Sequence, residues 1–244
     1  MNRILVLLNL LLLSTVSAQE TAEGVLDSMA SHLKSLDSFS VHMEKTFDDV
    51  MFDGAKIQFS GAADLSVRQP DRLYMVYGDE FTSKELWYDA KTFTLHDDLK
   101  NVYMQVDAEP NLRDALTKIR NRYNIHLPIM SLIRGNPAEN YGAAIKLRRY
   151  IGIHDVEGIP CHHVLFRSEE IDWQLWIQDG DTPLLRKYIV TYKQLEGAPQ
   201  DVVVLTDWEL NPKLKDKLFE AKVPEDAVLA EVLVRDEVQN DDNS

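Results

Sequence analysis

The sequence predicts a mainly β (α+β) protein in which one curved sheet of about eleven strands wraps around a few helical segments. Apolar residues recur at every second position through most of the chain, and turns rich in Gly, Pro and Asp separate these stretches. Helical spacing is confined to segments near residues 21–36 and 111–133 and to the chain end. Strands that are apolar on both faces need cover on both, and only a few helices are available. Either part of the inner wall of the sheet is free, or the helices fill the inside completely. The pattern leaves both alternatives open.

The first eighteen residues are typical of a secretory signal peptide. Arg3 precedes the apolar run Ile4–Leu13, and small residues at 16–18 provide a cleavage point after Ala18. The run is shorter than the ~20 apolar residues that cross a bilayer. We therefore expect export to the periplasm of a Gram-negative bacterium, with no transmembrane segment in the mature chain.

A helix is expected over Thr21–Leu36, where apolar residues recur at intervals of three and four. The period changes to two at Phe39. Strands are expected over residues 39–51, 55–68, 72–78, 84–89, 92–96 and 101–106. Asp53-Gly54 lies between the first two strands and is a hairpin signal.

The second half also begins with a helix that strands follow. A helix is expected over Asn111–Tyr123, followed by an apolar stretch at 127–133 that Gly135-Asn136-Pro137 ends. Strands are then expected over residues 144–154, 160–168, 171–178, 184–193 and 201–209. Near the end we expect a short strand and a helical turn beginning at Pro224. Residues 19–234 form a single domain, and 235–244 are an acidic disordered tail.

Two tryptophans three residues apart, Trp173 and Trp176, test the choice between helix and strand. On a helix they would share a face, and on a strand they point to opposite sides. Residues 171–178 are few for a helix, and Asp179-Gly180 ends them. Read as a strand, the segment places Ile171, Trp173, Leu175 and Ile177 on one face. The segment is therefore predicted to be a strand.

The net charge disfavours two classes of binding partner, and the single cysteine limits the disulfides that the chain can form. Loss of Arg3 with the signal moves the formal net charge from −14 to −15, which disfavours nucleic acid and anionic membrane surfaces. Cys161 is the only cysteine, so the chain has no internal disulfide. We expect it to be a small buried hydrophobic residue on a strand.

The sequence contains no motif for hydrolysis, zinc proteolysis, phosphate binding or thioredoxin chemistry. The run Cys161-His162-His163 resembles a metal site, but on a strand His162 faces away from the other two. A site would need distant ligands such as His42, His96 or His154. We expect no catalytic residues, no metal and no cofactor.

Two stretches resemble the periplasmic lipoprotein-localisation carriers LolA and LolB. Residues 61–77, GAADLSVRQPDRLYMVY, are similar to their second and third strands, and residues 89–103 are similar to the hairpin that follows. More closely, residues 156–193 resemble an uncharacterised family of predicted periplasmic proteins assigned to the same fold. The resemblance covers nearly all of the mature chain.

The resemblance implies a LolA/LolB-like half-open antiparallel β-barrel with helices as a lid over an apolar cavity. In the carriers a basic residue directly before the proline holds the lid; this chain has Gln69 there and Arg68 one place earlier. The superfamily that this chain resembles also includes a periplasmic stress sensor that binds protein partners.

We therefore expect a non-catalytic periplasmic binding or carrier protein for a hydrophobic ligand, a lipid or an acyl chain. The cavity wall is expected to contain Leu73, Met75, Tyr77, Trp173, Leu175 and Ile177. The alternative is a sensor or interaction module that binds a periplasmic or outer-membrane protein and carries no lipid.

Overall fold

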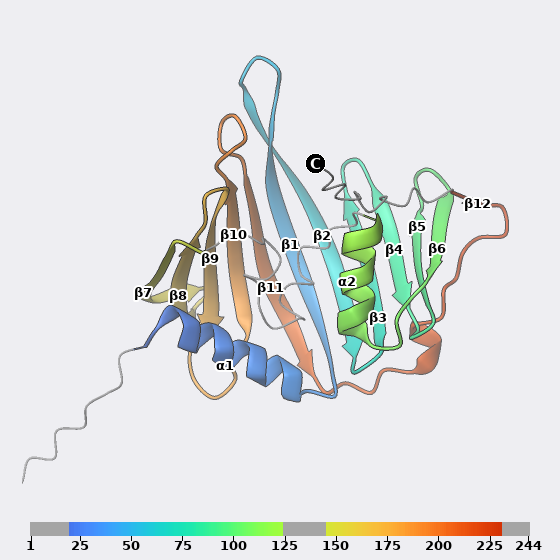
Figure 1. Cartoon of the computed structure of the whole chain (residues 1–244), viewed down its shortest axis with the longest axis horizontal. Helices are drawn as coiled ribbons and strands as arrows, with labels where there is room; N and C mark the ends of the chain where they lie inside the picture. The colour runs from blue at the N-terminus through green and yellow to red at the C-terminus, as the bar shows by residue number, and fades with distance from the viewer. Residues whose placement is uncertain (1–19, 124–144, 231–244) are drawn as a thin grey trace, which may run out of the picture.

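The computed structural model describes residues 20–123 and 145–230, and it contains one twelve-stranded sheet with two α-helices (Figure 1). The strand order is β12-β6-β5-β4-β3-β2-β1-β11-β10-β9-β8-β7. The mainly β class is confirmed, with twelve strands where about eleven were expected. The expected signal peptide, the stretch at 127–133 with its stop at 135–137, and the tail at 235–244 lie outside the described residues.

The helix α1 spans Ala22–Ser35 and agrees with the expected segment. Thr21 caps its first turn, because the Thr21 side chain accepts a hydrogen bond of 3.0 Å from the Gly24 backbone N–H. Its apolar residues, among them Val25 and Met29, are buried, and α1 contacts strands β7, β8 and β9.

The first six strands form consecutive antiparallel hairpins. They are β1 (Ser38–Val50), β2 (Lys56–Arg68), β3 (Arg72–Asp79), β4 (Ser83–Tyr88), β5 (Thr92–Asp97) and β6 (Val102–Asp107). The Asp53-Gly54 turn joins β1 to β2 as predicted: Gly54 has a φ of 84°, which a glycine adopts without strain. The first hairpin is the longest in the sheet and extends beyond its neighbours in Figure 1.

The helix α2 spans Leu112–Tyr123, also as predicted. The remaining long strands follow: β7 (Leu147–Val156), β8 (Ile159–Arg167), β9 (Ile171–Gln178), β10 (Leu185–Tyr192) and β11 (Gln200–Leu210). β11 returns to pair with β1, which joins the two halves into one sheet. The strand prediction for residues 171–178 is confirmed, with alternating burial along β9.

The C-terminal part differs from the prediction. A short 3₁₀ helix, η2 (Asp216–Leu218), precedes a two-residue strand, β12 (Val228–Leu229), which pairs in parallel with β6. A single turn does begin at Pro224 as expected, where the Ala227 N–H donates to Pro224 O at 3.1 Å. Within the described residues it does not continue as a helix, because Val228 and Leu229 pair with β6.

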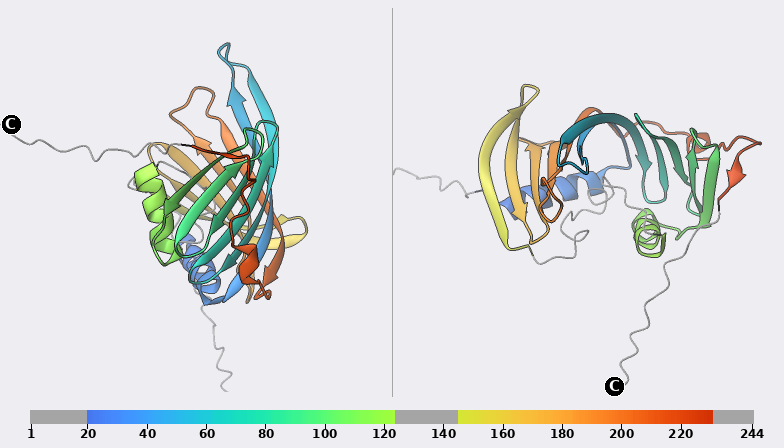
Figure 2. Two further views of the ribbon diagram at one scale, coloured as in Figure 1. Left: turned by 90° about the vertical axis from the view of Figure 1, so that its right-hand side faces the viewer. Right: turned by 90° about the horizontal axis from the view of Figure 1, so that it is seen from above.

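The sheet is curved but not closed. Figure 2 shows it as an arch, with α1 and α2 on the concave side. β12 and β7 stand at opposite edges of the strand order and are not paired with each other. The half-open form is therefore confirmed, and the main hydrophobic core lies between the concave face and the two helices.

A candidate ligand-binding face

Three of the expected wall residues lie on β3 and point to the concave side. Leu73 and Met75 are buried, and Tyr77 is half-buried and packs against the same core. Because side chains alternate along a strand, all three share one face. The Tyr77 hydroxyl donates a hydrogen bond of 2.5 Å to Asp79 Oδ2. Burial, with this bond and the nearby carboxylate, raises the pKa of Tyr77 far above its usual value, so the phenol stays neutral.

The other three wall residues lie on β9. Trp173, Leu175 and Ile177 are all buried, and Leu175 and Ile177 are fully inaccessible. Leu175 pairs with Val164 on β8 and with Tyr188 on β10. The side chains on this part of the concave face are therefore mostly apolar.

Cross-strand pairs connect the two groups. β3 and β9 are separated by β2, β1, β11 and β10 in the strand order. Paired residues on neighbouring strands lead from β3 to β10. Met75 on β3 pairs with Leu65 on β2, Leu65 with Val41 on β1, Met43 on β1 with Leu205 on β11, and Val203 on β11 with Tyr188 on β10. All of these residues belong to one hydrophobic cluster with the six expected wall residues. The structure thus brings the six residues onto one continuous face.

Both helices contribute apolar residues to this cluster. α1 adds Met29 and Leu33, and α2 adds Leu116 and Ile119. The start of α2 is tied to the sheet, because the Leu112 N–H donates to Pro70 O at 2.9 Å and the Tyr88 hydroxyl donates to Glu109 O at 2.6 Å. The concave face and the two helices therefore form one hydrophobic core.

The position that departs from the lipoprotein carriers still contacts a helix. The Gln69 side-chain amide donates to Leu33 O of α1 at 2.9 Å, and the Gln69 N–H donates to Asp37 O at 2.8 Å. Arg68 points to the convex side, where it donates to Leu214 O at 2.9 Å and pairs with Asp216. A neutral amide, rather than a cation, thus connects this turn to α1.

The convex face holds apolar groups that the sequence pattern detected but could not place. Trp176 stacks on His163 with ring centroids 4.0 Å apart, and the Lys187 ammonium lies 5.1 Å from the Trp176 ring centroid. Near the C-terminus, Phe219 is buried beside Arg68. Neighbouring side chains and the segment 211–230 therefore cover parts of the outer face.

The polar run at Cys161 has the predicted geometry. His162 lies opposite Ile177 and His163 opposite Trp176, so the two imidazoles face opposite sides of the sheet. His154, one of the distant residues that a metal site would need, does lie beside His163, with 3.2 Å between their Nδ1 atoms. Burial lowers the pKa of His163, which favours the neutral ring. Within residues 20–123 and 145–230, no group of three or more His, Cys, Asp or Glu is arranged to hold a metal ion.

The fold resembles several solved structures. An uncharacterised conserved protein from Thermus thermophilus matches with a TM-score of 0.53 at 10% identity, over 86% of this chain and 98% of that one. The lipoprotein LppX from Mycobacterium tuberculosis matches with a TM-score of 0.46 at 13% identity, over 80% and 97%. A LolA superfamily protein from Nitrosomonas europaea matches with a TM-score of 0.37 at 12% identity, over 83% and 99%. At its identity, the likeness to the Thermus protein shows the fold alone.

Two further comparisons bear on the family. No curated protein sequence matches this chain. Among the described residues, none of the helices has the length and apolar character needed to cross a membrane. Residues 22–233 match the family described as "Predicted periplasmic protein (DUF2092)", which is most of the chain. The chain therefore belongs to the DUF2092 family of predicted periplasmic proteins.

Proposed function

We propose that this protein is a non-catalytic carrier that binds a lipid or an acyl chain against its concave face. The observation that carries the proposal is the continuous apolar face from β3 to β9, which includes Leu73, Met75, Tyr77, Trp173, Leu175 and Ile177. Burial of an acyl chain contributes about 0.8 kcal/mol per methylene, so ten methylenes supply roughly 8 kcal/mol before ordering costs. Such binding requires no catalytic group.

The signal-like first eighteen residues and the family description support a periplasmic location in a Gram-negative cell. A carrier in this compartment moves between membranes through water. A ligand that is held on an apolar face inside the arch is shielded from that water.

Native mass spectrometry of the mature protein, purified gently from the periplasm and followed by organic extraction, tests the proposal. We expect a bound, extractable lipid of defined mass, or saturable uptake of a fluorescent fatty acid by the empty protein. An empty protein that also takes up no fatty acid would falsify the carrier function.

A pair of variants locates the ligand. Leu175→Glu places a charge on the concave face, and Gln174→Glu places the same charge on the next residue, which faces outward. We expect uptake to fall at least tenfold, about 1.4 kcal/mol, in the first variant and to stay within twofold in the second. If Leu175→Glu unfolds the protein, Met75→Gln is the milder substitute on the same face, paired with Val76→Gln. Equal uptake by inner and outer variants contradicts the assignment of the face.

The alternative function is a sensor or interaction module that binds a protein partner without lipid. Exposed apolar side chains at one end of the sheet favour this alternative. If native mass spectrometry finds no lipid, that end is the candidate site for the protein partner.

A further inference from the structure

Five turns of the sheet lie at the same end of the molecule. They join β1 to β2, β3 to β4, β5 to β6, β8 to β9, and β10 to β11, and in Figure 1 they form its upper end. In an antiparallel sheet alternate turns must fall at one end. We call these turns the rim, and define it as residues 48–57, 79–84, 97–101, 168–172 and 193–200.

Hydrogen bonds connect neighbouring parts of the rim. The Asp48 carboxylate accepts from the Gln200 N–H at 3.1 Å, and the Glu80 carboxylate accepts from the Ser60 N–H, in β2 just beyond the rim, at 3.2 Å. The Asp98 N–H donates to Ser83 O at 2.8 Å. These bonds hold neighbouring turns in fixed positions, so the rim has a defined structure.

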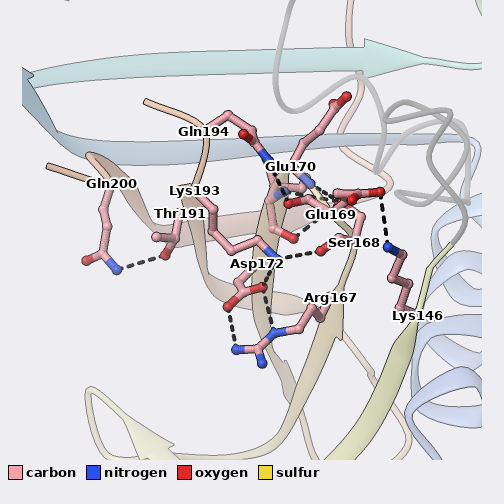
Figure 3. Close-up of polar contacts among 11 residues, drawn as sticks. Lys146, Arg167, Ser168, Glu169, Glu170, Asp172, Thr191, Lys193, Gln194 and Gln200 are labelled. Carbon is pink, nitrogen blue, oxygen red and sulfur yellow. Dashed lines mark hydrogen bonds and ion pairs between the residues drawn. The ribbon is translucent and has the colours of Figure 1, made fainter. Parts of the chain in front are cut away.

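The turn after β8 is tied to the turn after β10 in the same way (Figure 3). Lys193 donates through its backbone N–H to Glu170 O at 2.9 Å, and its ammonium group lies 2.9 Å from Asp172 Oδ1. Arg167 makes two hydrogen bonds to the same carboxylate, at 2.9 and 2.7 Å. Asp172 is therefore satisfied within the structure, whereas Glu170 has an exposed side chain.

Large apolar side chains are concentrated on the rim. Of the eleven exposed large apolar residues in the described part of the chain, six lie there: Met51, Phe52, Ile57, Phe81, Leu99 and Leu195. Phe52, at the tip of the longest hairpin, is 99% exposed, and Phe81 is 60% exposed. Exposed apolar groups gathered in one region indicate a binding surface.

An aromatic row supports the long hairpin beneath this tip. Phe47 and Phe59 lie 5.8 Å apart between ring centroids, and Phe59 meets Phe81 edge to face at 4.8 Å. The row connects the β1–β2 hairpin to the β3–β4 turn. Phe81 is therefore packed against the base of the hairpin, whose tip carries the exposed Phe52.

The rim is also acidic. Its 34 residues contain eleven Asp and Glu and four Lys, a net formal charge of −7. Arg167 and Lys146, which lie outside the rim, pair with Asp172 and Glu169, so the net formal charge with these two cations included is −5. Like charges concentrated in this way attract a cationic partner and repel an anionic one.

We propose that the rim is a docking surface for a basic segment of a partner protein, whose apolar side chains pack on Phe52 and Phe81. The charge disfavours an anionic bilayer, because the rim would repel it, and it disfavours rim-to-rim contact between two copies for the same reason. A cationic protein segment with apolar anchors satisfies both the charge and the exposed aromatic rings. This inference rests on the rim alone and is independent of lipid binding on the concave face.

Fluorescence anisotropy with two labelled amphipathic helical peptides tests the proposal. One peptide contains Leu and Lys, and the other has Glu at every Lys position. We expect saturable binding of the Lys peptide that weakens as salt rises, and no binding of the Glu peptide. Binding of both peptides alike overturns the charge argument.

Two matched pairs of variants assign the binding to the rim. Phe52→Ser with Phe81→Ser removes the rim anchors, and Ile153→Ser with Leu210→Ser removes exposed apolar groups elsewhere. The triple variant Asp49→Asn, Glu170→Gln and Glu196→Gln has the same total charge as Asp27→Asn, Glu220→Gln and Glu225→Gln, whose sites lie off the rim. We expect roughly fivefold or greater loss of affinity for each rim variant and less than twofold for each control. Equal losses within a pair contradict the proposal.

Two further measurements test whether a membrane or a second copy of the chain binds the rim instead. Co-sedimentation with vesicles of phosphatidylethanolamine and phosphatidylglycerol, and analytical ultracentrifugation of the protein alone, are carried out with the same variants. Vesicle binding or dimerisation that depends on Phe52 and Phe81 would replace the protein partner by a membrane or a second copy, and would overturn the proposal.

Discussion

Cys161 shows at the scale of one residue how burial controls reactivity. Its side chain is fully buried, and burial raises the pKa of the thiol to about 11. Because the thiolate is the reactive form, we expect the native protein to react with a thiol reagent at pH 8 much more slowly than a free cysteine. One equivalent should react within minutes after unfolding in guanidinium chloride. Rapid reaction of the native protein would show that this part of β8 opens.

Asp172 predicts a dependence of stability on pH. Partial burial by itself raises the pKa of this carboxyl, but the hydrogen bonds from Arg167 and Lys193 outweigh it and the pKa is lowered. The contribution is therefore present above the unfolded-state pKa of about 3.9 and is lost as the pH falls through the lowered value. We expect Asp172→Asn to lower the free energy of unfolding by about 1–2 kcal/mol at pH 7.

Urea denaturation at pH 7 and at decreasing pH checks this prediction. The difference between the wild type and Asp172→Asn should shrink as the pH falls toward 3. Asp27→Asn, an exposed position on α1, is the control and should change stability little at either pH. A difference that is independent of pH would assign the effect to packing rather than charge.

At the scale of the element, the contact between β2 and β3 depends on one glycine. A Cβ atom on Gly61 would lie 2.8 Å from Gly78 O and 2.9 Å from Asp79 Cβ, whereas one on Gly78 would have no neighbour closer than 3.9 Å. We expect Gly61→Ala to lower the free energy of unfolding by about 1–3 kcal/mol. Gly78→Ala should stay within about 0.5 kcal/mol, as measured by urea denaturation. Equal effects would show that β2 relaxes freely.

The strand β9 gives a test of its two faces. Trp173 is 5% exposed in the core, and Trp176 is half-buried on the convex side. We expect Trp173→Ala to destabilise the protein by about 3–5 kcal/mol and Trp176→Ala by about 1 kcal/mol. Thermal unfolding followed by circular dichroism compares them. A larger effect for Trp176 would contradict the assignment of faces.

At the scale of the whole molecule, the segment 211–230 connects the middle of the sheet to one of its edges. It leaves β11 near the middle of the sheet, anchors on Arg68 through Leu214 and Asp216, and ends in β12 on the edge of β6. We expect Phe219→Ala, at a residue 1% exposed, to cost about 3 kcal/mol. Hydrogen exchange at the Val228 and Ala230 amides should accelerate, while Leu218→Ala should have less effect.

The sequence by itself determined the local structure. Both long helices, eleven strands and the Asp53-Gly54 turn follow from periodicity and turn chemistry, because these signals act between residues that are close in the chain. Alternation likewise predicts that Trp173, Leu175 and Ile177 share a face, and that His162 points away from His163. The turn at Pro224 is present, but the pairing of the next residues with β6 was not predicted, since a two-residue strand has no period to detect.

Only the tertiary structure decided which faces meet. The connection of Met75 to Leu175 through four intervening strands, the approach of His154 to His163 and the pairing of β12 with β6 depend on strand order and curvature. The rim also depends on strand order, because an antiparallel sheet places its alternate turns at one end. Contacts between residues far apart in the chain are selected by the burial of whole faces, and a local pattern states which residues need burial but not which partners supply it.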